Sequence, residues 1–423
     1  MKRTIIGISM LSSALIFGAH WAAQPVALAN SVGQDGEEVG VGRGARLPRI
    51  AITADGKLGE VLRKNAALSS GFEVIERKSI PSSLVRAKGY DPAAWASVGA
   101  DVVVIVDSSG PQVKIRMFDQ RGGKKAVLSK AYPASNPLKA ADRFMNDVVE
   151  RFTDERGVFG SRIAYVRTRR DPRVSKNVQT VEMNGEAPTA VTSNRSLNVL
   201  PSIGPGGEVL FTSYAKRNPD LWISGGGGPK RISSFSGLNT GGVMSPTGSS
   251  IAVTLSKDGN PEIYTLSRSG GVKARLTKNK AIDVSPSWGP GGQIAFASNR
   301  AGGVHVYSMS GGGGGAKRLT KKGSYNQTPD WCPAKSCGEW VVYAGRDGSN
   351  RFDIFKVSTK TGTTKRLTQS SGRNLDPSWS PDGRLIAYSK EGGIFVANDE
   401  GNNQIKIARG GTSPDWGPRV EGY

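Results

Sequence analysis

Residues 377–383 read Pro-Ser-Trp-Ser-Pro-Asp-Gly, and this short stretch decides the fold because it returns through the C-terminal two thirds of the chain. Six copies occur, and in the first two Ile203 and Met244 stand where the other four have tryptophan. The copies begin at Pro201, Gly242, Pro286, Pro329, Pro377 and Pro414. Their spacing of 37 to 48 residues is typical of repeat architectures in which each repeat is one supersecondary unit.

The first five copies are each followed by an apolar triplet of strand-forming residues and then by a second short strand. The triplets occupy residues 209–211, 251–253, 294–296, 341–343 and 386–388. Gly, Asn and Ser turns separate these runs, several repeats end in Arg-Leu-Thr, and no segment keeps an apolar period of 3.6 residues. Short strands at this spacing predict one β-propeller blade per repeat, with the repeated tryptophans in the core.

The two ends of the repeat region complement each other. The sixth copy lacks its triplet, whereas Ile163, Ala164 and Tyr165 form an unmatched triplet before the first copy. We therefore predict that residues 162–423 form an all-β, six-bladed propeller in which the strand 163–166 completes the blade that begins at Trp416. Such closure removes exposed sheet edges.

The chain before the ring has a different pattern. Apolar runs at residues 49–53, 72–75 and 101–107, followed by an alternating run at 113–117, predict strands. The clearest helix follows the capping residue Asn136, has proline in its first turn and carries apolar residues on one face. These residues are Leu138, Ala141, Met145, Val148 and Phe152. A smaller α/β domain is therefore expected over residues 47–157.

The N-terminus has the features of a secretory signal. Lys2 and Arg3 precede an apolar stretch at residues 5–17 and an Ala-Leu-Ala cleavage motif. We expect residues 1–29 to be a signal peptide and residues 30–46 to be a flexible tail. The apolar stretch is shorter than the roughly 20 residues that cross a bilayer, so the exported protein is not expected to span a membrane.

The composition is strongly basic. The formal net charge is +22, with 57 Lys and Arg residues against 35 Asp and Glu residues. The basic residues are scattered along turns and strand ends rather than clustered on a helix, which argues against nucleic acid as a partner. Acidic proteins, anionic lipid head groups and cell-wall polymer stay open as partners, and so does a role of the charge in solubility alone.

Few residues are suited to catalysis or to binding a metal. The single histidine after the expected signal, His305, lies between apolar residues on a predicted strand, and no Gly-x-Ser-x-Gly turn is present. The glycine runs at residues 225–228 and 311–315 lack the Lys-Ser/Thr of a phosphate loop. In an exported chain, Cys332 and Cys337 are expected to form a disulfide rather than a metal site. We expect no enzyme activity, no cofactor and no metal.

One alternative function is kept open by three carboxylates. Asp283, Asp376 and Asp382 could bind a cation, or act as acid and base, in the propeller channel, as in propellers that process sugars. This alternative predicts a glycan-active enzyme or a glycan-binding protein.

The junction between the two predicted domains carries the most specific motifs of the chain. Residues 141–153 begin with Ala-Asp-Arg-Phe and end with Phe-Thr, and they are followed by Gly-Val-Phe at 157–159 and by Arg-Ile-Ala-Tyr-Val at 162–166. These motifs resemble the domain junction of the TolB family, the periplasmic component of the Tol-Pal cell-envelope system. The Pro-x-Trp-x-Pro and Arg-Leu-Thr elements also resemble that family.

The resemblance implies a periplasmic protein-protein scaffold that supports outer-membrane integrity and cell division. Its propeller mouth would receive Pal, the peptidoglycan-associated lipoprotein, and its N-terminal segment would engage the inner-membrane protein TolA. The Gly-rich tail around residues 39–44 is a poor match to the family's N-terminal box. We expect the protein to be a monomer.

The resemblance also implies which residues bind Pal, because the family's contacts lie largely in the loops just before each Pro-x-Trp element. The corresponding residues are Asn198, Leu238, Asn239, Thr240, Asp283, Val284, Tyr325, Asn326, Asn374, Leu375 and Asp376. Leu238 departs from the family, which often has histidine there. Loops that enter the innermost strands converge on the channel mouth, so a shared ligand is expected there. The alternative is that the Asn and Asp residues form turns at strand ends.

Overall fold

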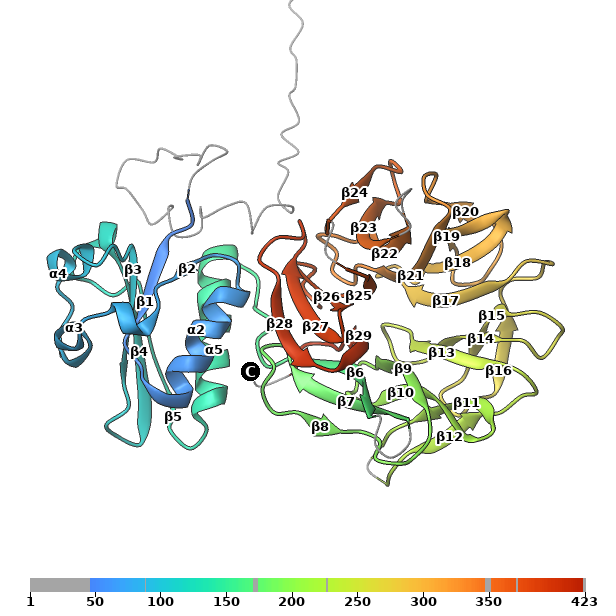
Figure 1. The fold of residues 1–423 in the computed structure, drawn as a ribbon, viewed down its shortest axis with the longest axis horizontal. Coiled ribbons are helices and arrows are strands. Elements are labelled where there is room, and N and C mark those ends of the chain that lie inside the picture. Colours follow the sequence, from blue (N-terminus) through green and yellow to red (C-terminus); the bar gives the residue numbers. More distant parts are fainter. Residues whose placement is uncertain are drawn as a thin grey trace, which may run out of the picture.

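The computed structural model describes residues 46–87, 89–169, 174–225, 227–346, 351–369 and 372–420. The expected signal peptide and nearly all of the expected tail fall in residues 1–45, outside these described ranges. The described chain forms an α/β domain followed by a β-propeller (Figure 1). No helix within these ranges is long and apolar enough to cross a membrane.

The α/β domain is built on a small mixed sheet. Its strands are β1 (Arg49–Ile52), β2 (Glu73–Val74), β3 (Val102–Asp107), β4 (Gln112–Asp119) and β5 (Leu128–Pro133). The order across the sheet is β2-β1-β3-β4-β5, with β1 parallel to β2 and β3 and with the remaining pairs antiparallel. Continuous apolar runs occupy β1 and β3 because these strands lie in the middle of the sheet.

Two long helices pack between this sheet and the propeller (Figure 1). The helices of the domain are α2 (Gly56–Leu68), α3 (Ser82–Arg86), α4 (Pro92–Ala96) and α5 (Pro137–Thr153), with 3-10 turns η1 (Arg77–Ser79) and η2 (Gln120–Gly122). Helix α5 begins as predicted: the Asn136 side chain accepts from the backbone N–H of Lys139 at 3.0 Å, and Pro137 is the first helical residue. Its buried face is wider than predicted, since Asp142 and Asn146 are buried together with the apolar residues.

The propeller has six blades of four strands each, which confirms the number predicted from the repeats. Blade 1 contains β9 (Asn198–Ile203), β10 (Val209–Lys216), β11 (Asn218–Ile223) and β12 (Lys230–Ser233). Blade 2 contains β13 (Asn239–Met244), β14 (Ile251–Leu255), β15 (Glu262–Leu266) and β16 (Val272–Arg275). Blade 3 contains β17 (Asp283–Trp288), β18 (Ile294–Ala301), β19 (Gly303–Met309) and β20 (Lys317–Arg318).

The last three blades complete the ring. Blade 4 contains β21 (Tyr325–Trp331), β22 (Trp340–Arg346), β23 (Phe352–Ser358) and β24 (Thr364–Arg366). Blade 5 contains β25 (Asn374–Trp379), β26 (Leu385–Lys390), β27 (Gly393–Asn398) and β28 (Ile405–Arg409). Blade 6 contains β29 (Gly411–Trp416), β6 (Arg162–Arg169), β7 (Ser175–Glu182) and β8 (Thr189–Ala190).

Blade 6 closes the ring with strands from opposite ends of the propeller sequence. Strand β29 pairs antiparallel with β6, and Trp416 lies opposite Ile163 in the register. This is the pairing that the unmatched triplet predicts. Three of the four tryptophans of the repeat, Trp331, Trp379 and Trp416, are buried in the core as predicted. Trp288 is half-buried and packs against the core from its edge.

The innermost strand of every blade contains a β-bulge directly before the Pro-x-Trp position. The residue at the bulge has a positive φ between 46° and 62° in all six blades. These residues are Leu200, Gly241, Ser285, Thr328, Asp376 and Ser413. In each blade the register with the second strand shifts across the bulge. Bulges bend a strand and redirect its side chains, and here they do so at the same level of each blade.

The two cysteines form a disulfide in the turn between β21 and β22. The Cα atoms of Cys332 and Cys337 are 5.8 Å apart. The two sulfur atoms pack against Gly383 of the next blade, where an added Cβ would lie 2.1 Å from the Cys337 sulfur. The turn of blade 5 therefore requires glycine at this position, both for this contact and for its φ of +71°.

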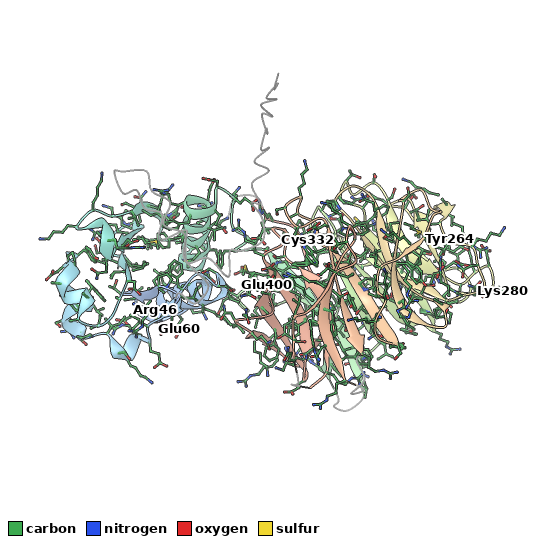
Figure 2. All side chains as sticks on the ribbon, turned by 90° about the horizontal axis from the view of Figure 1, so that it is seen from above. Arg46, Glu60, Tyr264, Lys280, Cys332 and Glu400 are labelled. Carbon is green, nitrogen blue, oxygen red and sulfur yellow. A yellow bond between two sulfur atoms is a disulfide. The ribbon has the colours of Figure 1, made fainter. Side chains whose placement is uncertain are left out.

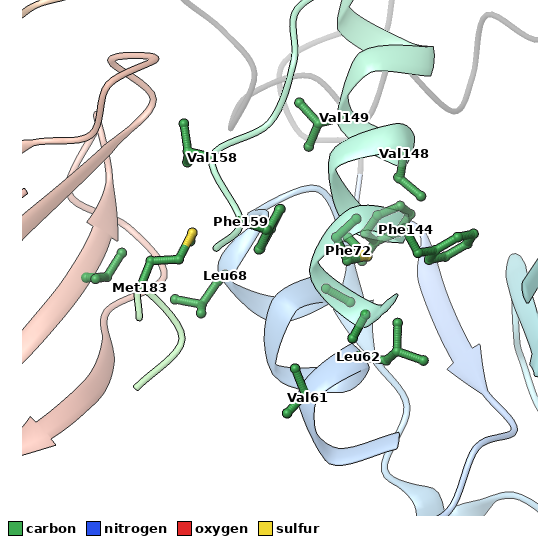
Figure 3. Packing of buried hydrophobic residues seen from close by; sticks show 14 of the residues in the cluster. Val61, Leu62, Leu68, Phe72, Phe144, Val148, Val149, Val158, Phe159 and Met183 are labelled. Atoms are coloured by element: carbon green, nitrogen blue, oxygen red, sulfur yellow. The ribbon is translucent and has the colours of Figure 1, made fainter. Parts of the chain in front are cut away.

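The two domains share one hydrophobic core (Figure 3). Leu68 at the end of α2 and Phe159 in the connecting segment lie beside Met183, which follows β7 of blade 6. Apolar residues of blade 5, among them Ile407, belong to the same cluster. The domains are therefore joined by continuous packing rather than by a solvated linker.

Polar contacts surround this shared core. Asp142 of α5 is buried, and its Oδ1 accepts from the side-chain amides of Asn65 at 2.7 Å and Asn184 at 3.1 Å. Ion pairs also join the domains, between Arg384 and Glu155 and between Lys57 and Glu186, each at 2.9 Å. Burial and the neighbouring carboxylate of Glu182 raise the pKa of Asp142 to about 7.

Candidate docking site at the propeller mouth

Each innermost strand begins on one face of the propeller, which we call the mouth face. In an antiparallel blade, the start of the first strand, the turn between the second and third strands and the end of the fourth strand lie at the same end of the sheet. The connections between blades that form this face are residues 191–197, 234–238, 276–282, 319–324, 367–373 and 410, of which the structure describes all but 370 and 371. The third-to-fourth-strand turns lie on the opposite face, and one of them carries Asn184 at the domain junction. The α/β domain therefore leaves the mouth face uncovered.

Five of the residues predicted to bind a partner are buried at the start of the innermost strands. Their exposed fractions are between 0 and 2%. These residues are Asn198, Asn239, Asp283, Asn326 and Asn374. Their side chains are hydrogen-bonded within the protein.

Four of these side chains join their blade to the blade before it. In blade 1, Asn198 Nδ2 donates to the Lys176 carbonyl of blade 6 at 3.1 Å. The other bonds are Ser233 Oγ to Asn239 Oδ1 at 2.7 Å, Asn326 Nδ2 to His305 Nδ1 at 3.2 Å, and Asn374 Nδ2 to Asp353 Oδ1 at 2.8 Å. A bulky side chain at position 239 or 326 would therefore disrupt the ring itself, because no space is left for it. Bulky substitutions at these two positions are therefore unsuitable for testing partner binding at the mouth.

His305 belongs to the same set of bonds. Its ring nitrogen Nε2 lies 2.8 Å from the guanidinium of Arg318, and its Nδ1 lies 3.3 Å from the Thr320 hydroxyl. Burial, followed by the charge of Arg318, lowers the pKa of His305. A neutral imidazole held in this way is a structural element of blade 3.

A second layer of inter-blade bonds lies deeper in the ring. In each of these bonds, the side chain of the middle residue of a Pro-x-Trp element accepts a hydrogen bond from a backbone N–H in the next blade. That N–H belongs to the residue at the tryptophan position. The bonds are Trp331 N to Ser287 Oγ at 2.9 Å, Trp379 N to Asp330 Oδ2 at 2.8 Å, Trp416 N to Ser378 Oγ at 2.9 Å, and Ile203 N to Asp415 Oδ2 at 2.7 Å. Burial raises the pKa of Asp330 to about 6 and raises the pKa of Asp415 well above its ordinary value.

The other predicted residues remain accessible. Leu238, Thr240, Val284, Leu375 and Asp376 are half-buried, and Tyr325 is 37% exposed. Asp376 sits at the bulge of β25, where it accepts from the Ser413 hydroxyl of the next blade at 3.0 Å. The structure thus divides the predicted set into buried residues that hold the strands and accessible residues around the channel mouth.

The three carboxylates of the glycan-active alternative do not come together. Asp283 is buried and paired with Arg300 at 2.8 Å, and Asp376 lies further along its own innermost strand. Asp382 lies in the β25–β26 turn at the opposite end of the sheet, where it accepts from the Ser380 hydroxyl at 2.5 Å. Within the described ranges, no group of three or more His, Cys, Asp or Glu side chains is arranged to hold a metal ion.

Two exposed apolar residues on the mouth face were not predicted from the sequence. Leu197 is 38% exposed and Ile282 is 46% exposed, and each directly precedes one of the buried Asn or Asp residues. Leu238 and Tyr325 occupy the same position in blades 2 and 4. A signal was present in the sequence, since an apolar residue stands before the Asn or Asp in four consecutive repeats.

Fold and site together define a class of protein: a six-bladed β-propeller that is fixed to an α/β domain, with a mouth face that this domain does not cover. A family model described as the TolB beta propeller domain matches residues 149–420. The chain belongs to this TolB β-propeller family.

Curated relatives and solved structures agree with this assignment. The Tol-Pal system protein TolB of Anaeromyxobacter dehalogenans is 35% identical over 245 residues, 54% of either chain. A TolB homolog of Chlorobaculum tepidum is 33% identical over 198 residues, 45% of this chain and 44% of its own. The chain thus spans about half the length of the curated relatives it matches. The crystal structure of TolB from Acinetobacter baumannii aligns with a TM-score of 0.75 at 25% identity, covering 88% of this chain and 97% of that one.

Proposed function

We propose that this protein is a periplasmic protein-protein binding scaffold of the Tol-Pal cell-envelope system, without catalytic activity. In this role it binds a Pal-like lipoprotein at the mouth face and a TolA-like inner-membrane protein through its N-terminal region, and so supports outer-membrane integrity and cell division. The observation that carries the proposal is the family match over the whole propeller, combined with a mouth face that the α/β domain leaves uncovered.

The accessible residues at the mouth are proposed to contact the lipoprotein. Thr240, Val284 and Asp376 line the entrance near the bulges, and Leu238 and Tyr325 lie at the rim. The buried residues of the predicted set contribute by holding these strands in register. Binding energy in protein interfaces is concentrated in a few residues, among which tyrosine is enriched, so Tyr325 is expected to contribute most.

The proposal is tested by titrating the mature protein with the lipid-free soluble domain of the Pal-like lipoprotein from the same organism. Val284→Trp combined with Tyr325→Ala should weaken binding at least about tenfold, because one change fills the entrance and the other removes a rim contact. Val272→Ala is the matched control, because Val272 is a 43% exposed apolar residue on the opposite face. Unchanged affinity in the double variant would exclude the mouth face as the binding site. Release of oligosaccharide from cell-envelope extract would favour the glycan-active alternative instead.

The N-terminal role is tested separately. Removal of residues 30–45 should abolish binding of a soluble domain of the TolA-like protein and leave binding of the Pal-like domain unchanged. TolA binding that survives this removal would place the TolA contact elsewhere on the chain.

A further inference from the structure

Four apolar side chains form an arc on the mouth face. Leu197, Leu238, Ile282 and Tyr325, which we call the apolar arc, occupy one equivalent position in blades 1 to 4, three residues before the bulge. Three of them are between 37 and 46% exposed, and Leu238 is half-buried. In blade 5 the equivalent residue is Arg373, and in blade 6 it is Gly410, so the apolar series stops there. Apolar side chains that gather on one face mark a surface for contact with another molecule.

The same connections that carry the arc also carry lysines that form no ion pair with the described residues. Lys278 and Lys280 precede Ile282, and Lys321 and Lys322 precede Tyr325; all four are exposed. Neither connection contains Asp or Glu, and no carboxylate among the described residues forms an ion pair with any of the four lysines. Figure 2 shows Lys280 at the end of the molecule farthest from the α/β domain. These ammonium groups are therefore available to a ligand.

Further cations surround the end of the arc in blade 4. Arg346 stacks over the ring of Tyr325 with 5.6 Å between the guanidinium carbon and the ring centroid. The Tyr325 ring meets Phe352 edge to face at 5.8 Å between centroids, and Arg373 stacks over Phe352 at 5.6 Å. These contacts hold Tyr325 in a fixed orientation, and a rigid tyrosine beside arginines is typical of the residues that contribute most to protein interfaces.

Two nearby carboxylates among the described residues do not neutralise this charge. Asp283 is buried and already paired with Arg300, and Asp258 in the β14–β15 turn is paired with Lys257 at 2.9 Å. The blades that carry the arc therefore present an excess of positive charge beside apolar surface. Such a surface attracts and orients an acidic partner during encounter.

The exposed fractions favour a protein over a lipid or a nucleic acid as the ligand. Leu197, Ile282 and Tyr325 are each more than half covered by their own neighbours, so they cannot project into a bilayer as the apolar face of an interfacial helix does. Three of the four arc residues, Leu197, Leu238 and Ile282, are aliphatic and offer no stacking surface to bases. Partly covered aliphatic side chains bordered by lysines are instead complementary to a protein segment in which carboxylates flank apolar side chains.

We infer that the apolar arc and its four lysines bind an acidic segment of the partner protein, in which Asp or Glu residues flank one or more apolar residues. The inference rests on the proposed function in placing the partner on the mouth face, and it adds the chemistry of the contacting segment. The lysines set the rate and the salt dependence of association, and the apolar arc sets the lifetime of the complex.

The test uses the full mature protein and measures the association and dissociation rates of the lipid-free Pal-like domain at several salt concentrations. Reversal of all four lysines, K278E with K280E, K321E and K322E, should lower the association rate at least about tenfold and remove most of its salt dependence. Ile282→Ala should leave the association rate unchanged and raise the dissociation rate by about threefold to tenfold. The exposed lysines Lys230 and Lys335 on the opposite face supply a charge-reversal control of half that size, for which both rates should stay within about twofold of the wild-type values.

The possible outcomes separate this inference from the proposed function. Normal association of the four-lysine variant, together with weak binding by Val284→Trp and Tyr325→Ala, would overturn the acidic segment and leave the mouth face as the site. Normal binding by all variants would overturn both. Vesicles containing phosphatidylglycerol are a second probe: retention of the wild-type protein on them, lost in the four-lysine variant and without binding of the Pal-like domain, would show that the lysines serve a lipid surface and would overturn the inference.

Discussion

The domain junction and the mouth face are two surfaces of one propeller. They differ in how many of their side chains are hydrogen-bonded, ion-paired or buried within the chain. At the junction, the amides of Asn65 and Asn184 bind Asp142, ion pairs cross the boundary, and apolar residues such as Met183 are completely buried. At the mouth face, Ile282 and Tyr325 remain partly exposed, and four lysines have no carboxylate partner among the described residues. The junction is thus a completed interface within the chain, whereas the mouth face has the composition of one half of an interface between chains.

The largest expected effect comes from the core of the junction. Met183→Ala removes a fully buried side chain from the packing between domains and should lower the free energy of unfolding by about 3 kcal/mol. Ile282→Ala on the mouth face should lower it by less than about 0.5 kcal/mol, because that side chain is already partly in solvent. Urea denaturation of both variants measures the contrast. Similar losses in the two variants would mean that the apolar arc is packed as tightly as the junction.

An intermediate effect is expected from the buried residues below the mouth. Asn374→Ala deprives the buried Asp353 carboxylate of a donor at 2.8 Å and should lower the free energy of unfolding by about 2 kcal/mol. Arg373→Ala, one residue earlier and exposed, is the control and should change stability by less than about 0.5 kcal/mol. Thermal unfolding followed by circular dichroism compares the two. If the Asn374→Ala variant is as stable as the wild type, the bond to Asp353 does not stabilise the ring. Asn374 would then again be a candidate residue for contact with the partner.

An effect that appears only at higher pH is expected at Asp142. Its pKa of about 7 in the folded protein lies above that of an unfolded aspartate, so the folded state holds the proton between about pH 4 and pH 7 and loses stability as the pH rises through this window. Asp142→Asn keeps an oxygen that accepts from Asn65 and Asn184 but carries no charge. At pH 8 the variant should be more stable than the wild type by about 1.4 kcal/mol for each unit by which folding raises the pKa, and near pH 4 the two should be equal.

Stability measured in steps from pH 4 to pH 8 gives this difference directly. The wild-type curve also contains contributions from Asp330 and Asp415, whose pKa values are raised by burial. These contributions are present in both proteins and cancel in the comparison. A difference that grows as the pH falls would contradict the assigned direction of the Asp142 pKa.

Most of the architecture follows from the sequence because local pattern and global fold agree there. The repeated Pro-x-Trp element marks the end of each innermost strand, and the unmatched triplet at Ile163 identifies the closing blade. The cap at Asn136 places the start of α5 correctly. These features are read from residues that are close together in the chain, and the physical rules that govern them are local.

Local sequence patterns do not predict which residues of the site are buried and which are accessible. Asn326 and Asn374 look like ordinary turn-forming residues, and their burial depends on partners in the preceding blade, about 20 residues upstream. Asp142 is not among the apolar residues from which the buried face of α5 was predicted. The helix contacts both the sheet and the propeller, so its buried face is wider than one apolar stripe. In both cases a contact between distant segments decides the environment, and no local pattern encodes it.

The closing pair of strands also constrains the order in which the protein can fold. β6 and β7 emerge first and form an incomplete sheet, whose inner edge stays unpaired until residues 411–416 arrive as β29. All intervening blades must be synthesised in the meantime, and an open edge of this kind favours aggregation. A chain with this design gains when its propeller strands stay unpaired until β29 is available to close the ring.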